Sequence, residues 1–250
     1  YGPMQLASPV LVGHRFVLSA TSGGSVHLLN ASDGAIVYST KLTGGISATP
    51  LLVDDNVFIG TEEGTIHLLS VCDGKPLWEK PVRVKGAVRS TPVLWQDSLL
   101  FVQDDRSVLH AVDTATGEVV YEYTGQSFAE RGLSPFTVFG YPSPSIAGDT
   151  VYAAFETGKV SRREVSGPDE ADNFTIVADW PAVLCDSSRK PADPDKLAIP
   201  ICSSRRFFTD ADSTPTLADE GLVAGCHCRG LFLLDPATGK SRWEAPLRGP

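Results

Sequence analysis

Residues 91–121 have the sequence TPVLWQDSLLFVQDDRSVLHAVDTATGEVVY. A Thr-Pro pair is followed by three short apolar runs separated by turns, and the segment ends in a Thr-Gly turn before Tyr121. Short runs rich in β-branched and aromatic residues between Gly and Asp turns are typical of strands. Gly117 stands where a tight hairpin needs a positive φ, which glycine adopts without steric cost. The segment therefore predicts four consecutive antiparallel strands, here called A to D.

The same pattern occurs five times along the chain. The Ser/Thr-Pro pair recurs at Ser8-Pro9, Thr49-Pro50, Thr91-Pro92, Ser143-Pro144 and Thr214-Pro215. The turn glycine and an aromatic residue four positions later recur as Gly34/Tyr38, Gly74/Trp78, Gly117/Tyr121 and Gly239/Trp243. The spacing from proline to glycine is 25, 24, 25 and 24 residues in these four repeats. In the fourth repeat the turn glycine is absent, and Val160–Val165 and Phe174–Trp180 are the predicted strands C and D.

These repeats predict an all-β protein, a β-propeller of four-stranded antiparallel blades, because four such strands in about 41 residues form one blade. The five blades are expected at about residues 6–42, 47–82, 89–124, 142–180 and 213–247, in a single domain of residues 1–250. Insertions at residues 125–141 and 181–212 follow the third and fourth blades. The aromatic side chain of strand D is expected to cover the seam between adjacent blades.

The phrases DTATGEVVY (residues 113–121) and DPATGKSRW (residues 235–243) resemble the signature of PQQ-like repeats. The resemblance covers nearly the whole chain and implies the propeller fold of the quinoprotein alcohol dehydrogenase-like family. That family includes PQQ-dependent dehydrogenases, BamB-type scaffold propellers and propellers attached to acyl-activating enzymes. Its members usually have seven or eight blades, which at about 41 residues each needs about 290–330 residues. We therefore expect blades beyond the five in this chain, with an unusual five-bladed ring as the alternative.

The composition excludes several partners. The net charge is -9 and the pI is about 5.0, so nucleic acid and anionic membrane surfaces are disfavoured. The sequence has no apolar run of 18 residues, and no membrane span is predicted.

We find no catalytic constellation in the sequence and predict no catalytic residue and no cofactor. There is no adjacent Cys-Cys pair and no C-x-x-C-H haem site of the kinds found in quinoprotein dehydrogenases, and no nucleophile elbow or H-E-x-x-H motif. The histidines His27, His67 and His110 recur at one place in strand C, which indicates a packing or surface position of the repeat. Carboxylate pairs such as Glu62-Glu63 and Asp104-Asp105 lie in turns, where solvated hairpin tips are expected.

Four cysteines are expected to meet on one face of the propeller. Because successive strands are antiparallel, B–C turns and D–A connections lie on one face, and A–B and C–D turns lie on the other. Cys226 and Cys228 fall at the B–C turn of blade five, and Cys185 and Cys202 lie in the connection leading into it. We favour disulfides among these four, with five reduced thiols or a four-cysteine zinc site as alternatives. Cys72 falls in a C–D turn and is expected to be unpaired.

The two insertions indicate where a partner would bind. Both are D–A connections, so both emerge on one face, and long loops on a rigid scaffold often carry binding residues. The candidate partner-binding residues are Phe128, Arg131, Phe136, Phe139 and Tyr141. Two sequons mark candidate N-glycosylation sites at Asn30 and Asn173, both in C–D turns on the opposite face.

The sequence thus favours a non-enzymatic scaffold propeller that binds a protein partner through the face with the two insertions. One alternative is an accessory propeller of a larger acyl-activating enzyme, with further domains on a longer chain. Another is a degenerate quinoprotein that binds a small ligand. An extracytoplasmic location, periplasmic or secreted, is favoured over the cytoplasm because of the expected disulfides.

Overall fold

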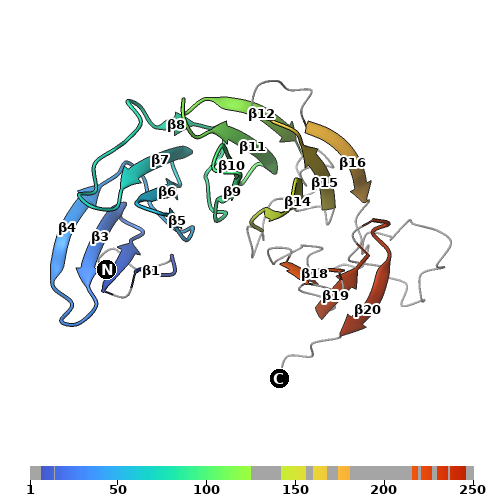
Figure 1. Cartoon of the computed structure of the whole chain (residues 1–250), viewed down its shortest axis with the longest axis horizontal. Helices are drawn as coiled ribbons and strands as arrows, with labels where there is room; N and C mark the ends of the chain where they lie inside the picture. The colour runs from blue at the N-terminus through green and yellow to red at the C-terminus, as the bar shows by residue number, and fades with distance from the viewer. Residues whose placement is uncertain are drawn as a thin grey trace, which may run out of the picture. The chain divides into compact units, whose positions relative to one another are not determined.

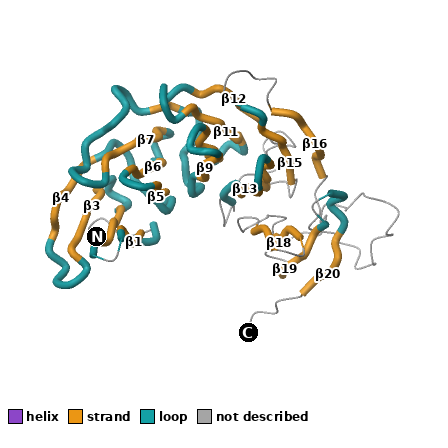
Figure 2. The backbone as a smooth tube through the Cα atoms, viewed as in Figure 1, coloured by secondary structure: helices purple, strands orange, loops and turns teal. Residues whose placement is uncertain are grey.

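The computed structural model describes residues 7–13, 15–124, 142–155, 160–167, 174–180, 216–218, 221–226, 230–235 and 237–245. The strands form five four-stranded sheets, each antiparallel and each with its strands side by side in chain order (Figure 1). In blade three, short loops and turns join the strands within the sheet (Figure 2). This confirms the predicted all-β fold of four-stranded blades. None of the described residues belongs to a helix long and apolar enough to cross a membrane.

Each blade has its strands in the order A to D. Blade one has β1 (Val10–Val12), β2 (Phe16–Ala20), β3 (Ser25–Asn30) and β4 (Ile36–Lys41). Blade two has β5 (Leu51–Val53), β6 (Asn56–Gly60), β7 (Thr65–Ser70) and β8 (Val82–Arg83). Blade three has β9 (Val93–Trp95), β10 (Leu99–Gln103), β11 (Val108–Asp113) and β12 (Val119–Thr124). Blade four has β13 (Ser145–Ala147), β14 (Thr150–Ala154), β15 (Val160–Val165) and β16 (Phe174–Trp180). Blade five has β17 (Thr216–Ala218), β18 (Gly221–Cys226), β19 (Gly230–Leu234) and β20 (Ser241–Ala245).

The chain divides into two compact units, residues 1–122 and 123–250, and the boundary falls inside β12. The prediction of a single domain remains a prediction. Strands β15 and β16 coincide with the segments expected for strands C and D of blade four, although this repeat lacks the turn glycine. Their place in the repeat and the aromatic residue Trp180 therefore located these strands without the turn signal.

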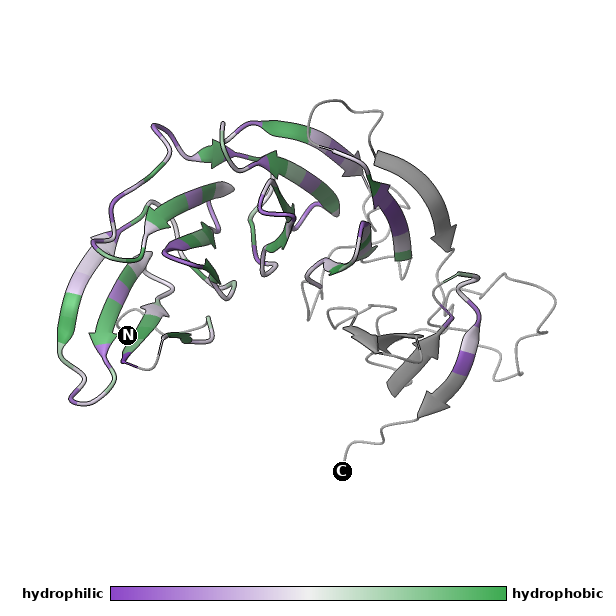
Figure 3. Ribbon diagram, viewed as in Figure 1, coloured by the Kyte–Doolittle hydropathy of each residue, from purple (hydrophilic) through white to green (hydrophobic). Residues whose placement is uncertain are grey.

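The core of the first unit lies between the blades. Along inner strands of this unit such as β6 and β10, hydrophobic residues follow one another (Figure 3) and are buried on both sides of the sheet, so both faces of these sheets are apolar. One cluster joins blades one and two, with Leu18 and Leu28 packed together with Val57 and Leu69. A second cluster joins blades two and three.

Trp78 occupies the seam between blades two and three, as the sequence predicts for the aromatic residue of strand D. The side chain is buried and its ring centroid lies 5.9 Å from that of Phe58. Its indole Nε1 donates a 2.9 Å hydrogen bond to the carbonyl of Thr114 in the C–D turn of blade three. The ring also closes over Gly117, where an added Cβ would lie 3.2 Å from it. Trp78 therefore joins two blades through both apolar contact and a hydrogen bond.

Strand D of blade two departs from the repeat. The residue of strand D that pairs with the first residue of strand C is Lys41 in blade one and Arg83 in blade two. Lys41 lies seven positions after the turn glycine Gly34, whereas Arg83 lies nine positions after Gly74. The two extra residues lift residues 77–81 out of the regular pairing, although the N–H of Leu77 still donates a 2.8 Å hydrogen bond to the carbonyl of Leu68. As a result β8 is only two residues long. Pro76 and Pro81 flank this segment, and proline cannot donate a ladder hydrogen bond. The aromatic slot is retained while the strand around it is interrupted.

Blade four brings a cation into the core of the second unit. The guanidinium carbon of Arg163 lies 3.7 Å from the ring centroid of Tyr123, and the side chain is 1 % exposed. Phe155 packs edge-on against the same ring with centroids 5.5 Å apart. By strand register, Arg163 takes the place that Val112 has in blade three. The interaction between a cation and an aromatic face is favourable, and more so where water is excluded. This position therefore accommodates a buried arginine.

Candidate partner-binding face

The face of the propeller expected to bind a partner is built from B–C turns and D–A connections. In the first unit its described parts are the B–C turns at residues 21–24, 61–64 and 104–107 and the D–A connections at residues 42–46 and 84–88. We call this surface the loop face. The C–D turns, at residues 31–35, 71–75 and 114–118, lie on the opposite face.

Backbone hydrogen bonds fasten each B–C turn of the loop face to a D–A connection. Between blades one and two, the N–H of Ile46 donates to the carbonyl of Thr21 at 3.1 Å, and that of Glu62 donates to the carbonyl of Gly45 at 2.8 Å. Between blades two and three, Val88 and Asp105 make the equivalent bonds to Thr61 and Ala87, both at 2.9 Å. Because these groups are paired within the protein, the loop face of the first unit is a rigid frame.

Blade three adds a buried polar cluster to this frame. The Nε2 atom of His110 lies 3.1 Å from Oδ2 of Asp104, and both side chains are fully buried. On the other side of the ring, Nδ1 lies 3.2 Å from Oε1 of Glu122, without the alignment of a hydrogen bond. Lys85, in the preceding D–A connection, places its ammonium group 3.6 Å from the same glutamate. The cluster therefore links strands C and D of blade three with the end of blade two.

Asp104 is the centre of this cluster because its carboxylate accepts several backbone N–H groups. Oδ1 accepts from Arg106 at 3.0 Å and from Val108 at 2.9 Å, and Oδ2 accepts from Gly86 of the preceding connection at 3.1 Å. Burial alone would raise the pKa of Asp104, but the hydrogen bonds from His110 and Val108 outweigh it and the pKa is lowered. Asp104 is thus held as a carboxylate in the interior.

The structure corrects the expectation for the carboxylate pairs in the turns. Asp104 is not a solvated hairpin tip, because it is 4 % exposed and serves as an internal cap for its own B–C turn. The equivalent residue in blades one and two is a threonine, Thr21 or Thr61. Its hydroxyl oxygen accepts a hydrogen bond from the N–H four residues later, as Oδ1 of Asp104 does in blade three. Glu63 is exposed, as expected for a turn, and Glu62 is half-buried.

The three histidines in register have a structural role, as expected, but in three different environments. His27 shares a 2.7 Å hydrogen bond with the hydroxyl of Ser39 near the surface, and His67 shares a 3.0 Å bond with Thr65. Burial lowers the pKa of His67. His110 is the fully buried member and the one paired with carboxylates. In the described part of the chain, no cluster of His, Cys, Asp and Glu side chains is arranged to hold a metal ion.

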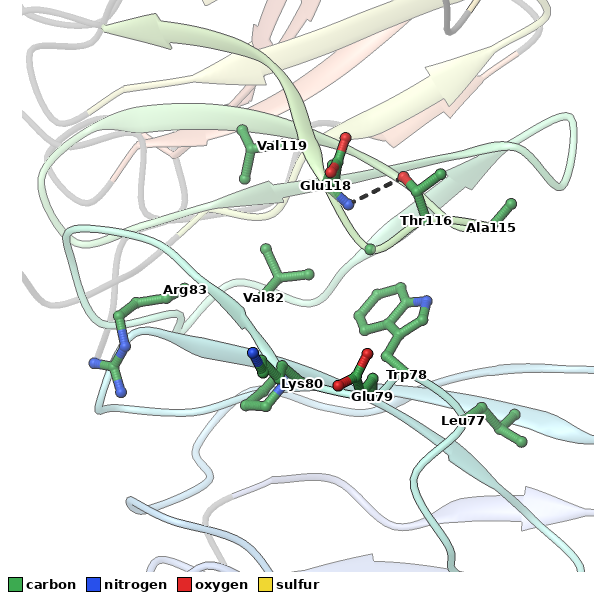
Figure 4. Close-up of a pocket in the computed structure, with 12 residues that line it drawn as sticks. Leu77, Trp78, Glu79, Lys80, Val82, Arg83, Ala115, Thr116, Glu118 and Val119 are labelled. Atoms are coloured by element: carbon green, nitrogen blue, oxygen red, sulfur yellow. Dashed lines mark hydrogen bonds between the residues drawn. The ribbon is translucent and has the colours of Figure 1, made fainter.

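The interrupted strand of blade two leaves a groove on the outer edge of the first unit. It has a volume of about 470 Å³ and lies between residues 77–83 and the C–D turn of blade three (Figure 4). Trp78 lies between the two walls, with Glu79 and Lys80 beside it on one wall and Glu118 on the other. The lining carries side chains of both charges and an exposed leucine, Leu77.

All five residues predicted to bind the partner lie outside the described part of the chain: Phe128, Arg131, Phe136, Phe139 and Tyr141. So do the rest of both insertions, the candidate disulfide residues Cys185, Cys202 and Cys228, and the sequon residue Asn173. Cys226 is the last residue of β18, immediately before the B–C turn of blade five, as expected from the alignment of the repeats. Cys72 is a free, exposed thiol in the C–D turn of blade two, as expected.

Asn30 ends β3 and stands at the C–D turn of blade one, on the face of the first unit opposite the loop face. Its side-chain oxygen accepts hydrogen bonds from the N–H and the hydroxyl of Ser32, at 3.1 and 2.9 Å. The sequon is thus folded into a local turn at the edge of a shallow groove. Its glycosylation remains a prediction.

The repeat match identifies the family. A family model described as outer membrane protein assembly factor BamB, of the PQQ-like repeat type, matches residues 3–80 and 51–176. The chain belongs to this family. Together the two overlapping matches cover blades one to three and most of blade four, so the BamB-type resemblance rests on the repeats themselves.

Three curated relatives are also outer membrane protein assembly factors named BamB. The protein of Legionella pneumophila (strain Paris) is 28% identical over 163 residues, which is 61% of this chain and 38% of the relative. That of Burkholderia pseudomallei (strain K96243) is 26% identical over 126 residues, 46% of this chain and 32% of the relative. That of Yersinia pestis is 20% identical over 210 residues, 84% of this chain and 45% of the relative. The chain thus spans between a third and a half of the length of these BamB proteins.

Solved structures support the same fold. The crystal structure of BamB from Moraxella catarrhalis matches 96% of this chain and 64% of its own chain with a TM-score of 0.69 at 16% identity. A computationally designed protein, Ika8, matches 96% of this chain with a TM-score of 0.64 at 13% identity. At these identities the likeness concerns the fold alone.

Two features of this BamB-type chain escaped the sequence interpretation. In the first two repeats a threonine stands six residues before the histidine of strand C, and in the third repeat an aspartate, Asp104, stands there instead. This exchange is the sequence signal for the Asp104–His110 pair. The groove of blade two was signalled by the two extra residues between Gly74 and the end of strand D. Both signals depend on aligning the repeats residue by residue within each strand.

Proposed function

We propose that this chain is the propeller part of an outer membrane protein assembly factor and that it binds a protein partner without catalysing a reaction. The observation that carries the proposal is the BamB family match over residues 3–176. The relatives that share this match are assembly factors by name. The partner would contact the face that carries residues 125–141 and 181–212, through Phe128, Arg131, Phe136, Phe139 and Tyr141.

The structure of the first unit supports a scaffold role. Its loop face is held by paired backbone groups and by the buried carboxylate of Asp104, so it can present connections with little loss of conformational entropy on binding. The exposed part of the loop face includes acidic side chains, among them Glu63. Aromatic and arginine side chains carry much of the energy in protein interfaces, and the predicted binding loop contains both types.

Deletion of the gene, in the organism that encodes it, tests this function. We expect the abundance of outer membrane proteins to fall and the unaltered gene to restore it. A Phe128→Ala/Phe136→Ala/Phe139→Ala variant should fail to restore it although the protein accumulates. A separate Arg131→Glu variant, which removes no apolar side chain, should fail in the same way.

Exposed residues of the C–D turns provide the matched control. An Asp33→Ala/Ala115→Ser variant changes two exposed positions on the opposite face and should restore outer membrane proteins fully. If deletion leaves outer membrane proteins unchanged, the assignment as an assembly factor is wrong. If both loop variants restore them as well as the control does, the partner binds elsewhere.

We also propose that the protein is extracytoplasmic and that Cys185, Cys202, Cys226 and Cys228 form two disulfides. The support is the family, since the matching relatives act in outer membrane assembly by name, together with the position of Cys226 at the end of β18. Mass spectrometry of the native protein after thiol alkylation should find Cys72 modified, since it is exposed and free. The other four should be modified only after reduction, and five thiols that react without reduction would exclude the pairing.

A further inference from the structure

A second cavity lies beside the displaced segment of blade two, residues 77–81, on the side that faces blade one. It has a volume of about 340 Å³, within the range of small-molecule sites. One wall is residues 40–43 at the end of blade one, and the other is β7 together with the displaced segment. The apolar part of the lining consists of Leu42, Leu68, Leu69, Pro76, Trp78 and Pro81.

The repeats show which group is missing from this cavity. In blade one His27 of strand C pairs with Ser39 of strand D, and the serine hydroxyl lies 2.7 Å from Nδ1 of the histidine. In blade three Oε1 of Glu122, again in strand D, lies 3.2 Å from Nδ1 of His110. In both blades, a polar side chain of strand D thus faces Nδ1 of the histidine in strand C.

Blade two lacks such a side chain. Continuing the register of β7 and β8 by one residue places Pro81 opposite His67, and proline brings no polar side-chain group to this place. Glu79, which has the same spacing from its turn glycine as Ser39 has in blade one, lies in the displaced segment instead. Nε2 of His67 lies 3.0 Å from the hydroxyl of Thr65, and within the described residues Nδ1 has no hydrogen-bond partner. His67 therefore lines the cavity with one ring nitrogen left for a ligand.

Two other polar side chains of the lining are already used within the protein. The hydroxyl of Thr40 donates a 2.8 Å hydrogen bond to a carbonyl in the C–D turn of blade two, and the ammonium group of Lys41 donates to a carbonyl in the B–C turn of blade one. Glu79 adds an exposed carboxylate to the lining. Because burial lowers the pKa of His67, its imidazole is uncharged at neutral pH. The cavity thus offers apolar walls and an uncharged nitrogen, and it offers an anion no free cation within the described residues.

We propose that this cavity binds a small, uncharged molecule with an apolar body and a hydroxyl group, an alcohol or a phenol, and that the hydroxyl bonds to Nδ1 of His67 as Ser39 does to His27. A hydroxyl suits this nitrogen in either tautomer of the imidazole, because it can donate or accept, whereas a carboxylate can only accept. A carboxylate in the cavity would also meet the like charge of Glu79. The apolar body would pack between Leu42 of blade one and Leu69 of blade two.

NMR chemical-shift titrations of the protein with p-cresol, toluene and benzoate test this proposal. The amide signals of residues 66–69 in β7 report on the cavity. We expect saturable shifts with p-cresol. Toluene, which lacks the hydroxyl, and benzoate, which carries a carboxylate instead, should each bind about fivefold more weakly or worse. The proposal rests on this cavity and not on the assembly function, so its failure would leave that function untouched.

Two substitutions locate the hydrogen bond. His67→Phe removes the nitrogen and should weaken p-cresol on the order of five- to tenfold while changing toluene by about twofold or less. Pro81→Ser places a hydroxyl where blade one has Ser39, at an exposed position, and should weaken p-cresol to a similar extent by occupying the nitrogen. His27→Phe is the matched control and should leave p-cresol unchanged, because Nδ1 of His27 is already bonded to Ser39.

Three results would overturn the proposal. The first is the absence of a saturable shift in β7 with p-cresol. The second is toluene or benzoate binding as tightly as p-cresol. The third is an unchanged affinity for p-cresol in both His67→Phe and Pro81→Ser, and Pro81→Ser alone decides this point if His67→Phe does not fold.

Discussion

Replacing Trp78 by alanine is expected to lower the free energy of unfolding of the first unit by about 3–5 kcal/mol. The ring is buried in the seam between two blades, and its indole nitrogen donates to the carbonyl of Thr114. The substitution removes the largest side chain of that cluster and leaves a carbonyl without its donor. Urea unfolding followed by far-UV circular dichroism measures the change, and hydrogen exchange of peptides from residues 15–122 assigns it to the first unit.

Leu77→Ala is the control for this prediction, because it is the neighbouring residue, is exposed and belongs to the same displaced segment. It should change the free energy of unfolding by about 0.5 kcal/mol or less. Trp78→Phe should lie between the two, since it keeps apolar contact with Phe58 and loses the hydrogen bond. If Trp78→Ala is as mild as Leu77→Ala, the seam is not held by this ring.

Replacing Asp104 by alanine is expected to destabilise the first unit by about 3–5 kcal/mol, the range for removing one partner of a buried pair. The variant leaves His110 without its carboxylate and leaves the N–H groups of Gly86 and Val108 without their acceptor. Asp55→Ala is the control, since Asp55 is an exposed carboxylate in the A–B turn of blade two and its φ is not positive. Equal unfolding midpoints for the two variants would contradict the proposed role of Asp104.

The same carboxylate predicts an acid dependence. The folded-state pKa of Asp104 lies below its usual value of 3.8, so its contribution to stability is present above about pH 4 and is lost as the pH falls through the lower folded value. The difference in unfolding free energy between the unaltered protein and Asp104→Asn should therefore be constant from about pH 5 to 7 and shrink below pH 4. A difference that stays constant down to pH 3 would show that the carboxylate is not selectively stabilised in the fold.

The repeats made the fold predictable because each strand leaves a local signal. Turn glycines such as Gly117 need a positive φ, and apolar runs such as that of β10 have a length and composition suited to a strand. The seam position of Trp78 followed from the same regularity, because an aromatic residue recurs at this place in strand D, and Tyr38 of blade one also packs against a seam cluster. The sequence therefore predicted the features that all the repeats share.

The features particular to one blade were harder to predict. The burial of Asp104 depends on the D–A connection of blade two, whose Gly86 approaches so closely that a Cβ there would lie 2.8 Å from the carboxylate oxygen. The groove beside Trp78 depends on two residues inserted into one strand. Both are tertiary effects at positions where the local sequence still resembles an ordinary turn or strand. The candidate binding residues in residues 125–141 lack a repeat pattern altogether, which is why their role remains a prediction.

Site-specific photo-crosslinking in the native organism tests the central claim, that a protein partner contacts the face with the insertions, most directly. A photoreactive amino acid is placed at Phe136 and Tyr141 in the first insertion and at Glu63 on the loop face of the first unit. As controls it is placed at Ser32, Asp73 and Ala115 in the C–D turns of the first unit. We predict protein adducts of defined mass from at least one position in the insertion and none from the three C–D turns. Adducts from the C–D turns, with no adducts from Phe136, Tyr141 or Glu63, would contradict the claim that the partner contacts the face with the insertions.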